Sequence, residues 1–146
     1  MTTDWTTLND PAWKNGRIAY LRLSKQDGII VMSLKATTAG NVVSVKEGAD
    51  FLIKTESGEV VKFKNHEFEI AGYGDGAINL RGSKALGVEL HFLATQEQVE
   101  IISKSKIAKV RLVTSEGNLE IEPETKKYKK GLQELFKTFA TFSAKY

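Results

Sequence analysis

The chain has 146 residues, of which 41% are hydrophobic and 27% charged, and its formal net charge is +3. This length fits one domain with a single core, and this composition is that of a globular chain rather than a disordered one. No apolar run approaches the roughly 20 residues of a membrane-spanning helix. Because cysteine is absent, disulfides, thiolate nucleophiles and cysteine-based metal sites are excluded.

Positive charge is concentrated in the last third of the chain. Residues 1–101 hold 11 basic and 13 acidic residues, whereas residues 102–146 hold 10 basic and 5 acidic ones. The start, MTTDWTTLNDP, has neither the basic end nor the apolar centre of a secretory signal. We therefore expect a cytoplasmic protein if this N-terminus is native, and an exported one if the chain is a mature fragment.

Residues 1–16 are polar without a sustained period, which predicts an N-terminal arm with Trp5 and Trp13 as its anchors. Residues 17–146 are predicted to form a single β-rich domain, because short apolar runs alternate there with turn residues. Hairpins are predicted for residues 18–34, 51–63 and 110–121, each with a glycine in its turn. Further short strands are predicted at residues 68–70 and 88–92.

The most unusual stretch is GYGDGAINLRGSK, residues 72–84. A phosphate-binding P-loop has four residues between its glycines and ends in Gly-Lys-Ser/Thr, whereas here five residues separate Gly76 from Gly82, and Ser83 precedes Lys84. Glycines at alternate positions remove side chains from one face, which favours a bend or bulge. The alternative, an anion-binding loop that presents Arg81, Ser83 and Lys84, stays open.

Two helices are predicted. Thr95 and Gln98 have the spacing of a capping box, which starts a helix that ends near residue 105. Apolar residues then recur every three or four positions from residue 125 to the end, which predicts an amphipathic helix. This stripe consists of Tyr128, Leu132, Leu135, Phe136, Phe139, Phe142 and Tyr146.

The sequence contains no recognisable catalytic set. His66 and His91 lack the spacing of metal ligands, so both are predicted to be surface residues. No Gly-x-Ser-x-Gly motif is present, and the paired glutamates alternate with apolar residues, as on a sheet with one solvated face. We therefore expect no catalytic residue, metal ligand or cofactor. A hydrolase that uses His66 and Glu67 is the enzymatic alternative.

Basic residues form two clusters, at residues 104–111 and 126–130. They could form one positive patch, but nucleic-acid binding would require exposed aromatic residues among them. Tyr128 lies in the second cluster, yet its spacing assigns it to the apolar stripe. We expect a protein or a small ligand as the partner rather than nucleic acid, no transmembrane segment, and a surface for homo-oligomer formation on the C-terminal helix.

A family resemblance rests on the segment from Leu86 to the end, which contains Gly87-x-x-Leu90, Ala94-Thr95-Gln96-Glu97-Gln98, Ile107-x-Lys109-Val110-x-Leu112-x-Thr114 and Gly117. In this order of motifs it resembles uncharacterised small β domains of bacterial secreted proteins and lipoproteins, although this chain has no lipobox cysteine. That resemblance implies no particular activity. Several strands closed by an amphipathic helix also resemble a pleckstrin-homology-type barrel. The additional helix predicted before residue 105 is a difference from that fold.

The predicted fold is mainly β (α+β): an antiparallel β sandwich or open barrel of about seven or eight strands, with a short helix and a C-terminal helix. The predicted function is a non-catalytic binding or interaction module. The alternative is an anion- or lipid-headgroup-binding adaptor, similar to a pleckstrin-homology domain, with a basic patch of Arg81, Ser83, Lys84, Lys126, Lys127, Lys129 and Lys130. Exposure of Trp5, Trp13 and Tyr73 together would instead indicate a glycan or peptide ligand.

Overall fold

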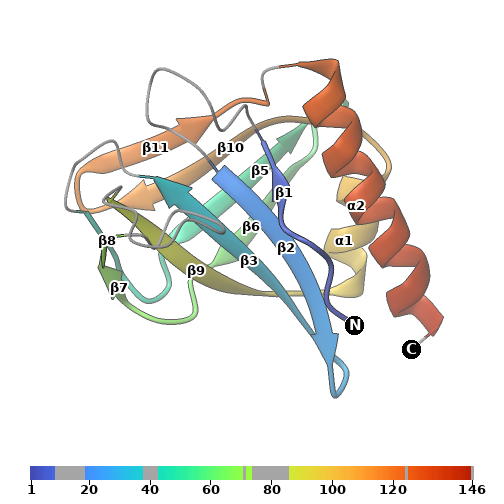
Figure 1. Ribbon diagram of the computed structural model, residues 1–146, viewed down its shortest axis with the longest axis horizontal. Helices are drawn as coiled ribbons and strands as arrows, with labels where there is room; N and C mark the ends of the chain where they lie inside the picture. The colour runs from blue at the N-terminus through green and yellow to red at the C-terminus, as the bar shows by residue number, and fades with distance from the viewer. Residues whose placement is uncertain (9–18, 38–42, 71, 74–85, 124, 146) are drawn as a thin grey trace.

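The computed structural model describes residues 1–8, 19–37, 43–70, 72–73, 86–123 and 125–145. Within these residues the strands form antiparallel sheets in the orders β1-β2-β3-β9-β8, β11-β10-β5-β6 and β4-β7. The five-stranded and four-stranded sheets form two layers, and both helices lie along one side of them (Figure 1). The predicted β sandwich with a C-terminal helix is therefore confirmed, and the sheets are not closed into a barrel.

The elements have the following bounds. The strands are β1 (Thr6–Thr7), β2 (Ala19–Gln26), β3 (Ile29–Thr37), β4 (Ser44–Val45), β5 (Asp50–Thr55), β6 (Val60–Lys64), β7 (Glu69–Ile70), β8 (Gly72–Tyr73), β9 (Leu86–Ala94), β10 (Ile107–Thr114) and β11 (Gly117–Ile121). The helices are α1 (Gln96–Ser103) and α2 (Lys126–Lys145).

All three predicted hairpins are present, as β2–β3, β5–β6 and β10–β11. The turn of the first contains Asp27 and Gly28 with φ angles of 53° and 79°, the left-handed backbone that a tight hairpin requires. Gly58 and Gly117 have φ angles of 95° and 100° in the other two turns. These short turns fix the register within each hairpin, and therefore fix which residues of each strand face the core.

The core lies between the two larger sheets. Phe51 of β5 stacks on Phe92 of β9 with 4.8 Å between ring centroids, and Phe63 of β6 packs at an angle against both rings. These three side chains are fully or almost fully buried. They join the four-stranded sheet to the five-stranded one, so the strand faces opposite to them point outward.

The helices cover one open side of the sandwich. The predicted capping box is present, because Thr95 Oγ1 accepts a hydrogen bond from Gln98 N and Gln98 Oε1 accepts one from Thr95 N. On α2, Leu132, Phe136 and Phe139 are fully buried and belong to the core. These three residues of the predicted apolar stripe therefore pack inside the domain, whereas Tyr128, Leu135 and Phe142 are half-buried.

Residues 1–8, the described part of the predicted arm, run along the edge of the five-stranded sheet, where Thr6–Thr7 form the edge strand β1. β1 pairs with β2, Thr3 N donates to Leu23 O at 2.9 Å, and Leu8 is fully buried. Trp5 is half-buried, with the Arg22 guanidinium 4.4 Å from its ring centroid. The second predicted anchor, Trp13, lies outside the described residues.

Candidate functional site

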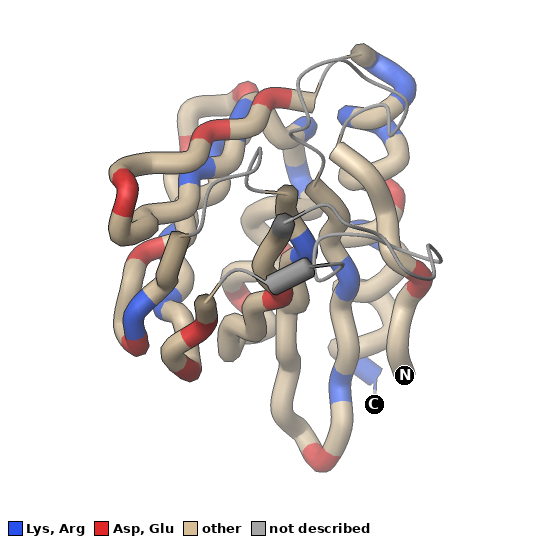
Figure 2. The backbone as a smooth tube through the Cα atoms, turned by 60° about the vertical axis from the view of Figure 1, so that its left-hand side comes forward, with Lys and Arg blue, Asp and Glu red and all other residues tan. Residues whose placement is uncertain are grey.

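The outward face of the four-stranded sheet carries a group of charged residues from neighbouring strands. Alternation along β5, β6 and β10 directs one set of residues into the core and the other set to solvent. Figure 2 shows acidic and basic positions close together along these strands. We call this surface the basic face and define it by Lys54, Lys62, Lys64, Lys109 and Arg111, together with Asp50, Leu52, Val60 and Glu120.

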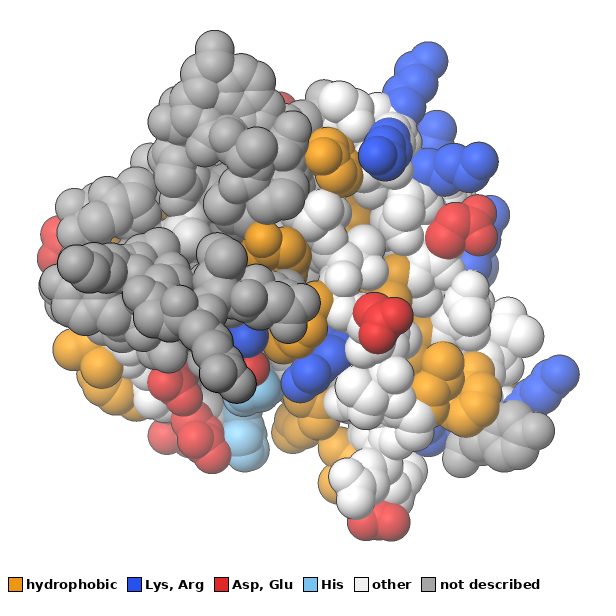
Figure 3. Space-filling model, in the orientation of Figure 1, with side chains coloured by type: hydrophobic (Ala, Val, Ile, Leu, Met, Phe, Trp, Pro, Cys, Tyr) orange, Lys and Arg blue, Asp and Glu red, His pale blue; other side chains and the backbone are white. Residues whose placement is uncertain are grey.

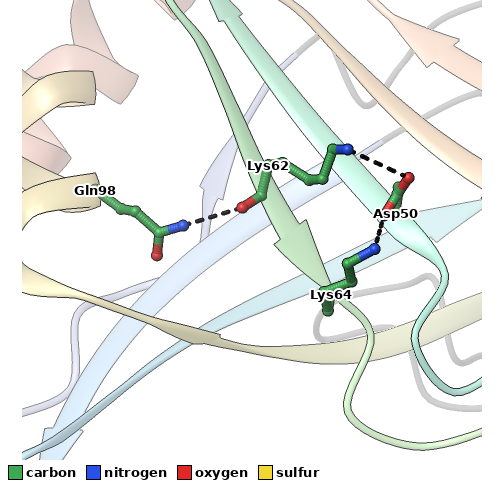
Figure 4. Close-up of polar contacts among 4 residues, drawn as sticks. All are labelled: Asp50, Lys62, Lys64 and Gln98. Carbon is green, nitrogen blue, oxygen red and sulfur yellow. Dashed lines mark hydrogen bonds and ion pairs between the residues drawn. The ribbon is translucent and has the colours of Figure 1, made fainter.

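At one end of the basic face, Asp50 is held by two lysines of β6. Lys64 Nζ lies 2.7 Å from Asp50 Oδ1, and Lys62 Nζ lies 3.9 Å from Asp50 Oδ2 (Figure 4). The hydrogen bond from Lys64 is the main reason why the pKa of Asp50 lies below its ordinary value, and the charge of Lys62 acts in the same direction. Figure 4 also shows Gln98 of α1 donating to Lys62 O, which ties the helix to this strand.

At the other end, Glu120 of β11 pairs with two cations of β10. Arg111 Nε donates to Glu120 Oε1 at 2.6 Å, and Lys109 Nζ lies 3.6 Å from Glu120 Oε2. The Arg111 hydrogen bond is the main cause of a Glu120 pKa below the ordinary value. One carboxylate therefore partly neutralises two cations.

Lys54 lies near the end of β5 that is farther from Asp50, one outward-facing position beyond Leu52, which pairs with Arg111. It is the direct cross-strand neighbour of Lys109 on one side and of Val60 on the other. Among the residues that the structure describes, no carboxylate oxygen lies within 4.0 Å of its Nζ. Two like charges directly opposite each other on a sheet destabilise it by a few tenths of a kcal/mol. An anion bound between Lys54 and Lys109 would remove that repulsion.

A hollow of about 240 Å³ opens at this point of the basic face. Its lining consists of Leu52, Lys54, Val60, Lys109 and Arg111, and we call it the Lys54 hollow. Leu52 is half-buried, whereas Val60 is 59% exposed. The hollow thus combines three cations with two aliphatic side chains, which suits an anion that also has an apolar part.

The lysines predicted as an anion patch lie at the start of α2. Lys126, Lys127 and Lys130 are exposed there, and Figure 3 shows lysines gathered over this end of the helix. Lys129 instead pairs with Glu56 at 2.7 Å. That contact is the main cause of a lowered Glu56 pKa, to which Lys106 and Lys126 also contribute. The two basic clusters of the sequence therefore meet around Glu56.

The other predicted contact residues are only partly described. Arg81, Ser83 and Lys84 lie outside the described residues, as does Trp13. The backbone of Tyr73 belongs to β8, at the edge of the five-stranded sheet. Trp5 lies near Arg22 and also near Lys35, whose Nζ is 5.1 Å from the ring centroid. The predicted grouping of Trp5, Trp13 and Tyr73 thus stays a prediction.

The two histidines are close together, although they are 25 positions apart in the sequence. His66 N donates to His91 O at 3.2 Å, and His91 Nδ1 lies 2.8 Å from Ser33 Oγ. Both histidine side chains are exposed, as predicted, whereas Ser33 is buried. Within the described ranges, no group of three or more potential ligands could hold a metal ion. Glu67 is exposed as well, and a hydrolytic role for His66 and Glu67 stays a prediction.

Sequence reasoning missed Lys54, Lys62 and Lys64 as site residues. Their positions follow from the hairpin that was predicted, because lysines alternate with buried residues in FLIKT and VVKFK. That alternation was a usable signal for a basic sheet face. The pairing of β5 with β10, which places Lys54 opposite Lys109, has no local signal.

No family model, no curated protein and no solved structure matches this chain. Among the described residues, neither helix has both the length and the hydrophobicity of a membrane span.

Proposed function

We propose that this protein is a non-catalytic binding module whose ligand carries negative charge and binds in the Lys54 hollow of the basic face. One observation carries the proposal: Lys54 lies opposite Lys109 without a carboxylate partner among the described residues, beside a hollow lined by a third cation, Arg111. Cations that the fold leaves incompletely neutralised favour binding of an anion and raise its rate of association.

This proposal places the ligand elsewhere than the predicted patch on α2. The α2 lysines are also exposed, but Lys129 already has Glu56 as a partner, and the charge of Lys126 acts on the same carboxylate. The Lys54 hollow has both unneutralised charge and a concave shape. It therefore supports a defined ligand position better than the start of the helix does.

Retention on immobilised heparin, with matched double variants, tests the proposal. Replacement of Lys54 and Lys109 by glutamine removes two charges from the basic face, and replacement of Lys126 and Lys127 by glutamine removes two from α2. We expect heparin to retain the wild type at low salt and to release it as the salt concentration rises, because salt screens exposed charges. We also expect the first variant to elute much earlier than the second.

The opposite order of elution would move the site to α2 and support a lipid-headgroup adaptor. In that case the wild type should bind to vesicles of phosphatidylserine and phosphatidylcholine, and the α2 variant should not. Equal elution of the two variants, or a wild-type protein that heparin does not retain, would contradict the proposed binding site.

A further inference from the structure

We propose that the Lys54 hollow recognises a phosphate monoester whose carrier has an apolar group next to the phosphate. This inference rests on the proposed function and names its ligand class. The supporting observations are the charge of the hollow, the arrangement of its cations, and the aliphatic side chains beside them.

Charge favours a dianion. The hollow is lined by Lys54, Lys109 and Arg111, and Glu120 is the carboxylate paired with the last two. Three cations less one carboxylate leave a net charge of +2 around the hollow. A phosphate monoester carries about −1.5 to −2 at neutral pH, whereas a carboxylate or sulfonate carries a single charge. A phosphate monoester therefore neutralises the hollow more completely than either monoanion.

The arrangement of the cations is also suited to a phosphate. Lys54 and Lys109 are direct cross-strand neighbours, so a group with several acceptor oxygens can contact both ammonium groups at once. Lys109 Nζ is 3.6 Å from Glu120, farther than Arg111 Nε at 2.6 Å. Lys109 is thus the less firmly held of the two cations and can turn toward a ligand.

The aliphatic side chains indicate an apolar carrier. Val60 is 59% exposed and lies directly across from Lys54, while Leu52 is half-buried beside it. Inorganic phosphate would leave both side chains in contact with water. A carrier with an apolar group beside its phosphate would cover them, and this burial would add to the affinity.

Titration of the full-length protein by two-dimensional amide NMR tests the inference, with phenyl phosphate as the probe. Methyl phosphate keeps the dianion but lacks the ring, and benzenesulfonate keeps the ring but has one charge. We expect phenyl phosphate to shift amide signals of β5, β6 and β10. We expect its affinity to exceed that of benzenesulfonate by about two- to fivefold, the range for one exposed charge contact. We expect it also to exceed that of methyl phosphate, because only the ring covers Leu52 and Val60.

A second experiment measures the affinities of the same probes at two pH values. The second pKa of a phosphate monoester is about 6, so lowering the pH from 7.5 to 5.5 removes most of the second charge of phenyl phosphate. Benzenesulfonate keeps its single charge over this range, and any titration of the protein affects both probes. We expect the affinity for phenyl phosphate to fall relative to that for benzenesulfonate.

Three variants test whether the phosphate binds in the Lys54 hollow. Lys54→Gln should weaken phenyl phosphate binding by about two- to fivefold, because it removes one contact. Glu120→Gln should strengthen binding, because Lys109 and Arg111 lose their internal carboxylate. Lys64→Gln is the matched control: it removes the same charge from the same sheet face, but Lys64 pairs with Asp50 and does not line the hollow. We expect no change in affinity for Lys64→Gln.

The outcomes separate this inference from the proposed function. Equal affinity for phenyl phosphate and benzenesulfonate, or equal effects of Lys54→Gln and Lys64→Gln, overturns the phosphate inference. If heparin retains the wild type through Lys54 and Lys109 but phenyl phosphate does not bind, the inference fails and the proposed function stands. If heparin does not retain the wild type, both fail.

Discussion

Asn65 has a structural role that depends on its amide group. The residue is 2% exposed, and its Nδ2 lies 3.2 Å from Val45 O and 3.0 Å from Lys46 O. Its backbone N donates to Ala49 O, and its backbone O accepts from Gly48 N, both at 2.8 Å. Asn65 therefore fixes the chain between β4 and β5 against the end of β6, next to the strands of the basic face.

Asn65→Ala should lower the free energy of unfolding by about 1–3 kcal/mol, because buried carbonyl groups lose their donor. Asn118→Ala is the control, since Asn118 is exposed on β11 and its replacement should change stability by less than about 0.5 kcal/mol. Urea unfolding followed by tryptophan fluorescence measures both variants. Equal stability of the two variants would show that the amide of Asn65 is dispensable.

At the scale of elements, α2 is tied to the rest of the sandwich by apolar and polar contacts. Its residues Leu132, Phe136 and Phe139 are fully buried in the core. Ser143 Oγ lies 2.6 Å from Gln96 Oε1 of α1, and Lys25 Nζ of β2 donates to Ser143 O at 2.7 Å. Because the core includes this helix, the sheets cannot close their interior without it.

A chain that ends at Thr125 should be insoluble or molten, since it exposes the core surface that α2 covers. Near-ultraviolet circular dichroism and a thermal melt of any soluble fraction test this. Within the full chain, Phe136→Ala should lower the free energy of unfolding by about 3–5 kcal/mol, whereas Lys137→Ala, at an exposed position, should change it little. A soluble truncated chain with a sharp thermal transition would contradict this account of α2.

At the scale of the whole molecule, three ion-paired carboxylates link stability to pH. Asp50, Glu56 and Glu120 each have a pKa below the ordinary value, with hydrogen bonds from Lys64, Lys129 and Arg111 as the main causes. These bonds join β5 to β6, the β5–β6 turn to α2, and β10 to β11. A carboxyl group with a lowered pKa stabilises the folded state above its unfolded pKa, and this contribution is lost as pH falls through the folded pKa.

The unfolded pKa values of these groups are about 4, so we expect their contribution to be constant from pH 6 to 8 and to be lost as the pH falls below about 4.5. Urea midpoints measured between pH 7 and pH 3 show this loss. The control is the variant with Asp50→Asn, Glu56→Gln and Glu120→Gln, whose midpoint should fall less over the same range. The difference should be small, because exposed ion pairs contribute little. Identical pH profiles would exclude a contribution from these three groups.

The sequence by itself determined the elements whose signals are local. The Asp27-Gly28 turn, the Thr95–Gln98 capping box and the stripe of α2 are each specified by residues within a few positions of one another. Short turns also fix hairpin register, and with it the outward direction of Lys54 and Lys62. The fold class and the existence of a basic sheet face could therefore be read from the sequence.

Only the tertiary structure decided which hairpins are neighbours. β5 pairs with β10, so Lys54 lies opposite Lys109, 55 positions later in the chain. Likewise, Lys129 pairs with Glu56, and His66 N donates to His91 O, although the residues of each pair are far apart in the sequence. These pairings follow from the packing of the entire core, to which every buried side chain contributes, and no short segment specifies them. The charges of the candidate site are thus a property of the sequence, while their convergence on one hollow is a property of the fold.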